Sequence, residues 1–171
     1  MPGFSLYSNE LSIEEKIALA EYLWKKYGTY IAADREIDRL LGLYRKVISR
    51  SYELMEKLGV VTVCAICATQ VPGGGCCGAG IEDWYDEFVL LLNLLLERKI
   101  PTERLGEKDC LFLGPTGCQL FARHHFCINY LCSRITDLLS PAELTALRAQ
   151  SGKEIFLGWQ LERLLRTRLS N

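Results

Sequence analysis

The sequence has no hydrophobic run long enough to cross a membrane. Its most apolar stretch, residues 88–96, reads FVLLLNLLL and is interrupted by Asn93. A membrane-spanning helix needs roughly 20 consecutive apolar residues. We therefore expect a soluble protein with no membrane partner, in which this stretch is a helix buried on most sides.

An excess of charge of either sign is also missing. The chain carries 20 Lys and Arg residues against 21 Asp and Glu, a net charge of −1. Nothing in this balance draws the protein to nucleic acid or to an anionic membrane. The N-terminal sequence MPGFSLYSNELSIEEK lacks the basic start and apolar run of a secretory signal. We expect a cytoplasmic protein whose thiols stay reduced.

The chain has 171 residues, which suits one domain and suffices to bury a core without disulfides. We predict an all-α, mainly helical fold, with a single domain over residues 1–171. An irregular cysteine-rich metal-binding region over residues 61–135 is expected between helical segments at 11–58 and 140–169.

Helix signals are clear in the N-terminal third. Ser12 and Glu15 have the spacing of a capping box, and apolar residues follow at helical intervals until Gly28, which is expected to end the helix. A second apolar stripe runs from about Ile31 to Lys57. This stripe could form a homodimer through a partner helix, but packing within its own domain is the commoner use.

The middle of the chain predicts more irregular structure. Residues 60–80, VVTVCAICATQVPGGGCCGAG, are expected to form a loop because of Pro72 and five glycines. A helix over residues 81–99 would carry Glu82 and Asp83 in its first turn. The sequence GPTG at 114–117 predicts a turn.

The C-terminal part predicts helices again. Residues 125–139 are expected to be helical, and Ser140 to Glu143 predict a second cap for a helix that reaches about Leu147. Ser151 and Gly152 are expected to break this helix before a last one.

Cysteine is the residue that sets this sequence apart. All eight cysteines fall between positions 64 and 132, and the two flanking parts have none. Buried structural cysteines would be scattered through every helix, so this confinement indicates one shared task. The residues are Cys64, Cys67, Cys76, Cys77, Cys110, Cys118, Cys127 and Cys132.

A disulfide framework is the main alternative, because an even count at irregular spacing also fits a secreted, disulfide-stapled protein. The missing export signal and the length of the chain argue against it. Metal binding remains: the pair Cys64 and Cys67 has CxxC spacing, and soft thiolates select zinc, iron–sulfur clusters or Cu(I). Taken alone, a CxxC could equally be a redox dithiol.

Geometry limits how the other cysteines are used. Neighbouring residues point about 100° apart on a helix, so Cys76 and Cys77 can serve one centre only from an irregular loop. Cys127 and Cys132 would point about 140° apart on one regular helix. We expect this pair to straddle the start of a helix.

These motifs together resemble a known family. CAIC, GGGCCG, CLFLGPTGC and RHHFCINYLC, within residues 61–135, are similar to the YkgJ-like family of cysteine-rich proteins described as zinc- or iron-chelating. The resemblance implies that all eight cysteines are candidate metal ligands. Arg123 matches the arginine of the family's Arg-Pro-x-x-Cys motif, while His124 stands where the family has proline.

The resemblance leaves the metal open between zinc and iron. Four thiolates around zinc and four around a 4Fe–4S cluster carry the same charge of about −2. A glycine-rich ligand loop can offer backbone N–H groups to cluster sulfurs, whereas structural zinc more often uses two CxxC knuckles. We expect a 4Fe–4S iron–sulfur cluster, with zinc as the alternative.

Three functions compete at this point. The first is an iron–sulfur protein that acts in electron transfer, in sensing, or as an accessory to a partner enzyme. The second is a structural zinc module that binds another protein through its helices. The third is an enzyme with an open metal coordination site, for which the candidate polar groups are Asp109, His124, His125, Asn129 and Tyr130. His124 and His125 could supply a nitrogen ligand or lie beside the centre, and Arg123 and Arg134 could neutralise it or face solvent.

Overall fold

The computed structural model describes residues 11–70 and 75–169. This part of the chain is mostly helical and contains a small two-stranded hairpin, so the all-α prediction is confirmed. In chain order the elements are α1 (Ile13–Ala33), α2 (Arg35–Lys57), α3 (Val60–Gln70), η2 (Gly75–Cys77), η3 (Glu82–Trp84), α4 (Glu87–Leu95), β1 (Leu113–Gly114), β2 (Gly117–Cys118), α5 (His125–Asn129), α6 (Ser133–Thr136) and α7 (Pro141–Leu169).

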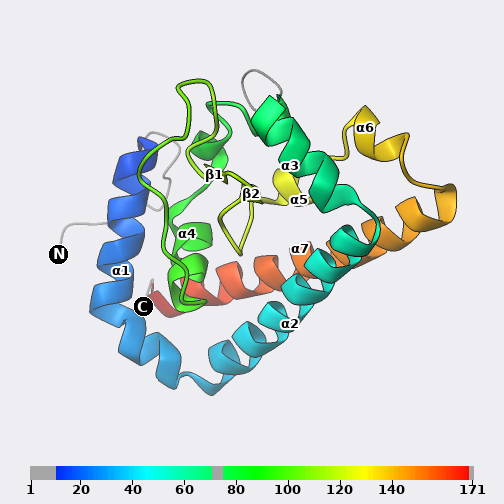
Figure 1. Ribbon diagram of the computed structural model, residues 1–171. Coiled ribbons are helices and arrows are strands. Elements are labelled where there is room, and N and C mark those ends of the chain that lie inside the picture. Colours follow the sequence, from blue (N-terminus) through cyan, green and yellow to red (C-terminus); the bar gives the residue numbers. More distant parts are fainter. Residues whose placement is uncertain (1–10, 71–74, 170–171) are drawn as a thin grey trace.

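Three long helices frame the molecule. In Figure 1, α1 forms the left side and α2 the lower edge, while α3 and α6 lie above α7 at the right; α4 packs against α1, and α2 runs along α7. The buried stripe of α2 includes Ile37, Leu40, Tyr44 and Ile48. Gln150 of α7 donates a hydrogen bond to the carbonyl of Val47 (3.1 Å). The stripe is therefore covered by a helix of its own chain.

The corner between α1 and α2 differs from the prediction. The capping box of Ser12 and Glu15 is confirmed, but α1 continues through Gly28 to Ala33. A single glycine inside a helix costs only about 1 kcal/mol relative to alanine, which tertiary packing readily outweighs. Asp34 makes the corner, because its carboxylate accepts hydrogen bonds from the N–H groups of Glu36 and Ile37 at the start of α2.

The helix α7 is continuous, so the expected break at Ser151 and Gly152 is wrong. The helix packs along α2 on both sides of this point, through Gln150 and Gly158. A Cβ atom added at Gly158 would lie 3.0 Å from the hydroxyl oxygen of Tyr44. Ser140 and Glu143 exchange the hydrogen bonds of the predicted cap at its start.

The predicted loop at 60–80 is wrong over residues 60–70, which form α3. Val60 is fully buried with Ile135, Leu139 and Leu147 in a second, smaller core. This burial overrides the weak helix propensity of the β-branched residues. Gly59, at φ +74°, makes the turn from α2 into α3. Pro72, Gly73 and Gly74 lie outside the described residues.

Two further helices are shorter than predicted. The helix expected over 81–99 begins at Glu87, capped by Asp86, and ends at Leu95. Glu82 is instead buried in η3, where it accepts hydrogen bonds from Arg104 and from the N–H of Leu111. The helix expected over 125–139 is divided into α5 and α6.

The turn predicted at 114–117 is confirmed as the hairpin that joins β1 to β2. Leu113 pairs with Cys118, and Gly114 pairs with Gly117, whose φ of +119° suits glycine.

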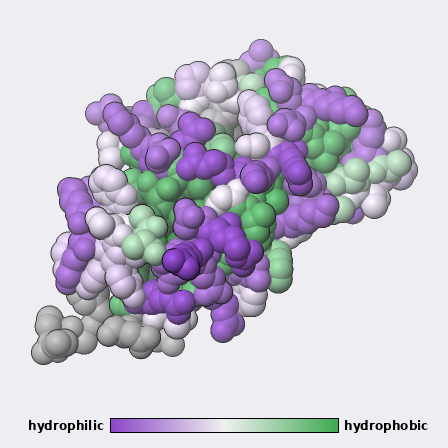
Figure 2. Space-filling view, turned by 90° about the horizontal axis from the view of Figure 1, so that it is seen from below, coloured by the Kyte–Doolittle hydropathy of each residue, from purple (hydrophilic) through white to green (hydrophobic). Residues whose placement is uncertain are grey.

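The structure contains no helix, within the residues it describes, that is both long and apolar enough to span a membrane. Residues 88–92 of the apolar stretch lie in α4, where most of their side chains are buried. Figure 2 shows one face of the molecule, on which hydrophilic side chains cover much of the surface and hydrophobic ones appear in patches between them.

Candidate metal centre

The cysteines of five separate segments meet around one cavity. This cavity has a volume of about 420 Å³ and lies between the two hydrophobic cores. Apolar side chains such as Val60, Phe112 and Leu147 form much of its wall. Six of the eight cysteines line it: Cys64, Cys76, Cys77, Cys110, Cys118 and Cys127.

The CxxC motif lies on α3. Cys64 and Cys67 are one turn apart, so they share a face of the helix. Gly75 lies directly against Cys67, because a Cβ atom at Gly75 would collide with the Cys67 sulfur. With φ at +60°, Gly75 also has a backbone conformation that favours glycine. This contact holds the start of η2 beside the end of α3.

Cys76 and Cys77 follow in η2, a short 3₁₀ turn, where the sequence predicts an irregular loop. The carbonyl of Cys77 accepts a hydrogen bond from the N–H of Cys110 (2.8 Å), which places the Cys110 segment alongside η2. The thiol of Cys77 donates to the sulfur of Cys76. This bond lowers the pKa of Cys76 and raises that of Cys77.

The three remaining cysteines come from the hairpin and the two short helices. Cys118 is on β2 and Cys127 is in α5, while Cys132 occupies the N-cap position of α6. The pair at 127 and 132 does not straddle one helix start as predicted, because α5 ends at Asn129 and both cysteines precede Ser133, the first residue of α6. The hydroxyl of Tyr85 donates to the sulfur of Cys127 (3.9 Å).

The thiols lie close enough to one another to affect their protonation. Burial raises the pKa of Cys64 to about 11, and the neighbouring Cys76, Cys132 and Cys67 contribute to the rise. Cys67 and Cys132 thus lie near Cys64, although they do not line the cavity. Burial likewise raises the pKa of Cys110 to about 12.

The thiols surround a space instead of meeting at a point. Within residues 11–70 and 75–169, no three Cys, His, Asp or Glu side chains are grouped in a way that would hold one metal ion. The donor set is the soft thiolate type that binds zinc, iron–sulfur clusters or Cu(I). Its spread around a cavity fits a group larger than a single ion.

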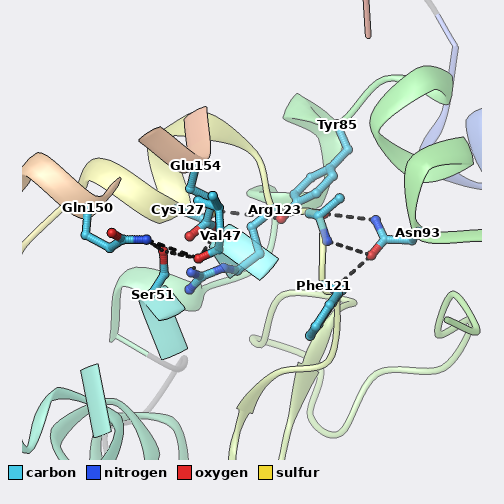
Figure 3. A network of polar contacts seen from close by, with 10 residues as sticks. Val47, Ser51, Tyr85, Asn93, Phe121, Arg123, Cys127, Gln150 and Glu154 are labelled. Carbon is cyan, nitrogen blue, oxygen red and sulfur yellow. Dashed lines mark hydrogen bonds and ion pairs between the residues drawn. The ribbon is translucent and has the colours of Figure 1, made fainter. Parts of the chain in front are cut away.

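Arg123, like Arg98, is one of the two arginines among the described residues that line the thiol cavity. Its guanidinium lies 3.4 Å from a carboxylate oxygen of Glu154, with 18% of the Arg123 side chain exposed and none of Glu154 (Figure 3). The positive charge of Arg123 lowers the pKa of Cys64 and of Cys127, against the larger effect of burial. Arg134, the other arginine considered from the sequence, is exposed.

The two histidines line a different cavity, of about 460 Å³, to which Arg123 also contributes. The Nδ1 atom of His124 accepts a hydrogen bond from the N–H of Phe126, so this side chain caps α5. Burial, and then the neighbouring His125, lower the pKa of His124 to about 4. Neither histidine lines the cavity of the thiols.

The polar groups considered for an open catalytic metal site do not converge. Tyr130 lines the thiol cavity, while His124 and His125 line the other cavity. Asn129 is exposed at the end of α5. The backbone of Asp109 pairs with that of Gly78.

Sequence reasoning missed three residues that build the site. Tyr85 is 1% exposed and contacts Cys127, Glu154 neutralises Arg123, and Asn93 fixes the backbone just before Arg123. Asn93 had a signal in the sequence, because a lone polar residue in an apolar run must find buried hydrogen-bond partners. Tyr85 and Glu154 are brought to the site from distant parts of the chain and had no local signal.

Comparison with protein-family models, with curated proteins and with solved structures finds no match for this chain in any of the three. The resemblance of residues 61–135 to the YkgJ-like family therefore stays a prediction.

Proposed function

We propose that this protein holds an iron–sulfur cluster, of the 4Fe–4S type, through its cysteine thiolates. The observation that carries the proposal is the convergence of six cysteines from separate segments on one cavity of about 420 Å³. Cysteines recruited only to fill the core would have no reason to share one cavity. The two remaining cysteines lie beside Cys64, so the whole set belongs to one neighbourhood.

The size of the cavity favours a cluster over zinc. A structural zinc ion draws four ligands to about 2.0–2.3 Å from one point. No such tight group occurs among the described side chains, and the cavity that six of the cysteines line is larger than one ion. Zinc binding through rearranged thiols is the alternative that the experiments must separate.

The surroundings of the cavity suit a redox centre. An iron–sulfur cluster supplies reversible one-electron chemistry, and its potential depends on burial, charge and hydrogen bonds to the sulfurs. Here much of the wall is apolar, Arg123 brings positive charge, and Tyr85 donates to the sulfur of Cys127. We infer a role in electron transfer, in sensing, or as an accessory to a partner protein in the cytoplasm.

The cavity thiols must lose their protons to bind metal. Because burial raises the pKa of Cys64 and Cys110, these side chains are neutral at pH 7 in the metal-free protein. Metal binding then releases protons and tightens as the pH rises. Proton release during reconstitution, measured in weakly buffered solution, is expected to accompany uptake of iron.

Cys→Ser variants test which thiols hold the centre. In protein prepared without oxygen, the double variant Cys64→Ser/Cys76→Ser should lose most of its bound iron. Thr116→Ser, which changes another residue that lines the cavity, should retain it. Full iron content in the double variant and in Cys110→Ser/Cys127→Ser would contradict a centre in this cavity.

A further inference from the structure

The second cavity is a separate feature of the fold. It lies between α7 and the segments that carry Trp84 and His124, and its volume is about 460 Å³. Ligand pockets commonly fall between about 300 and 1,000 Å³. Among the residues that the structure describes, no cysteine lines this cavity, and it shares only Arg123 and Ile128 with the cavity of the thiols.

One face of α7 forms a wall of this cavity. Gly152, Phe156, Trp159 and Glu162 all line it, at intervals of three or four residues that place them on the same side of a helix. A Cβ atom added at Gly152 would meet nothing within 4 Å. This position therefore leaves open space beside the helix, where a larger residue would project.

Aromatic rings surround the cavity and remain accessible. Trp84, Phe156 and Trp159 line it, yet about half of each residue is exposed, at 48%, 55% and 50%. Such rings attract cations over their faces. The ring of Trp159 already makes one such contact, because the guanidinium of the exposed Arg163 lies 5.1 Å from the centroid of this ring.

The charged side chains that line the cavity, Asp86, Glu162 and Arg123, carry a net charge of −1. Asp86 and Glu162 both pair with the single guanidinium of Arg166, at 2.7 and 3.0 Å. Burial, and then the charge of Asp86, raise the pKa of Glu162 in spite of this arginine. Arg123 is already paired with Glu154, and His124 is neutral at pH 7, so neither supplies a free positive charge.

We propose that this cavity binds a small organic cation, a quaternary or tertiary ammonium group on a compact apolar body. The aromatic rings would contact the methyl groups and the spread positive charge, while Asp86 and Glu162 supply the opposing charge. An anion would be repelled by these two carboxylates. A neutral molecule of the same shape would lose the electrostatic attraction.

Choline and its neutral isostere 3,3-dimethylbutan-1-ol test the proposal as a matched pair. Binding to the whole protein is measured by titration calorimetry and by the fluorescence of the lining tryptophans. Choline should bind saturably and about tenfold more tightly than the alcohol. Equal binding of the two, or no saturable binding of choline, would overturn the proposal.

Three variants locate the binding. Glu162→Gln should lower the affinity for choline about fivefold and leave the affinity for the alcohol unchanged. Glu14→Gln, at an exposed position, is the control and should change the affinity for neither ligand. Gly152→Leu should block both ligands by filling the cavity, with folding checked by circular dichroism.

The outcome is independent of the metal. Cys64→Ser/Cys76→Ser protein should bind choline as the parent does, so loss of iron and loss of choline binding are separate results. Choline binding that is unchanged in both Glu162→Gln and Gly152→Leu would place the ligand elsewhere and overturn the proposal.

Discussion

The side-chain amide of Asn93 forms hydrogen bonds with both backbone groups of Ala122. The Nδ2 atom donates to the carbonyl of Ala122 (2.9 Å), and the Oδ1 atom accepts from the N–H of Ala122 (3.0 Å). The same oxygen accepts from the N–H of Phe121 (2.8 Å), as Figure 3 shows. One fully buried side chain thus fixes the backbone that presents Arg123 to the thiol cavity.

Asn93→Leu is expected to be strongly destabilising. The leucine has the same branching and the same number of side-chain heavy atoms but leaves buried backbone groups of Phe121 and Ala122 without partners, at about 1–3 kcal/mol each. We expect the free energy of unfolding in urea to fall by about 3 kcal/mol or more. The control Asn129→Ala, at an exposed position, should change it by less than about 0.5 kcal/mol. A loss of similar size in both variants would contradict this role of Asn93.

The pair of Arg123 and Glu154 should behave as a buried ion pair. Glu154→Leu leaves the guanidinium of Arg123 without its partner and should cost about 3–5 kcal/mol. The double variant Arg123→Met/Glu154→Leu should recover much of this loss. Arg45→Ala, which breaks the exposed pair with Glu97, should cost less than about 1 kcal/mol. If the double variant were as unstable as Glu154→Leu, isolation of the charge would not be the cause.

Glu97 occupies a position that favours glycine. It ends α4 with φ at 62°, in a Schellman arrangement where the N–H of Arg98 donates to the carbonyl of Asn93 (2.8 Å) and that of Glu97 to Leu94 (3.0 Å). Glu97→Gly should therefore raise the free energy of unfolding by about 0.5–1 kcal/mol. Glu97→Ala removes the same side chain without relieving the backbone strain at positive φ, so it should not raise the free energy of unfolding. Equal effects of the two variants would contradict the backbone explanation.

His124 should make the fold sensitive to mild acid. Burial lowers its pKa from 6.5 to about 4 in the folded protein. Between these values the unfolded chain binds a proton that the folded chain does not, so stability falls as the pH drops through this window. The measurements are the imidazole titration by NMR and urea unfolding at pH 7 and pH 4.5. His124→Gln should lose less stability over this range than the parent, and equal losses would contradict the assignment.

The sequence predicted the features that depend on local chemistry. The capping boxes at Ser12 and Ser140 and the turn at residues 114–117 are confirmed, because each depends on residues within a few positions. The confinement of the cysteines also predicted that they share one region. These signals need no knowledge of distant contacts.

The errors arose where tertiary packing outweighs local preference. Residues 60–70 form a helix because Val60 is buried against α6 and α7 residues of the second core, which no local pattern reveals. The helix α7 runs through Gly152 because its neighbours pack along α2. Glu82 looked like a favourable charge at a helix start, yet it is buried and bound to Arg104. The second cavity joins residues from distant segments and had no signature in the sequence.

The most direct test of the central claim is metal and sulfide analysis of the whole protein, made and kept without oxygen. We expect a brown protein that contains iron and acid-labile sulfide in about equal amounts and loses its colour in air. The colour should also be lost in Cys64→Ser/Cys76→Ser. A colourless protein with stoichiometric zinc, which takes up no iron on reconstitution, would contradict the iron–sulfur account.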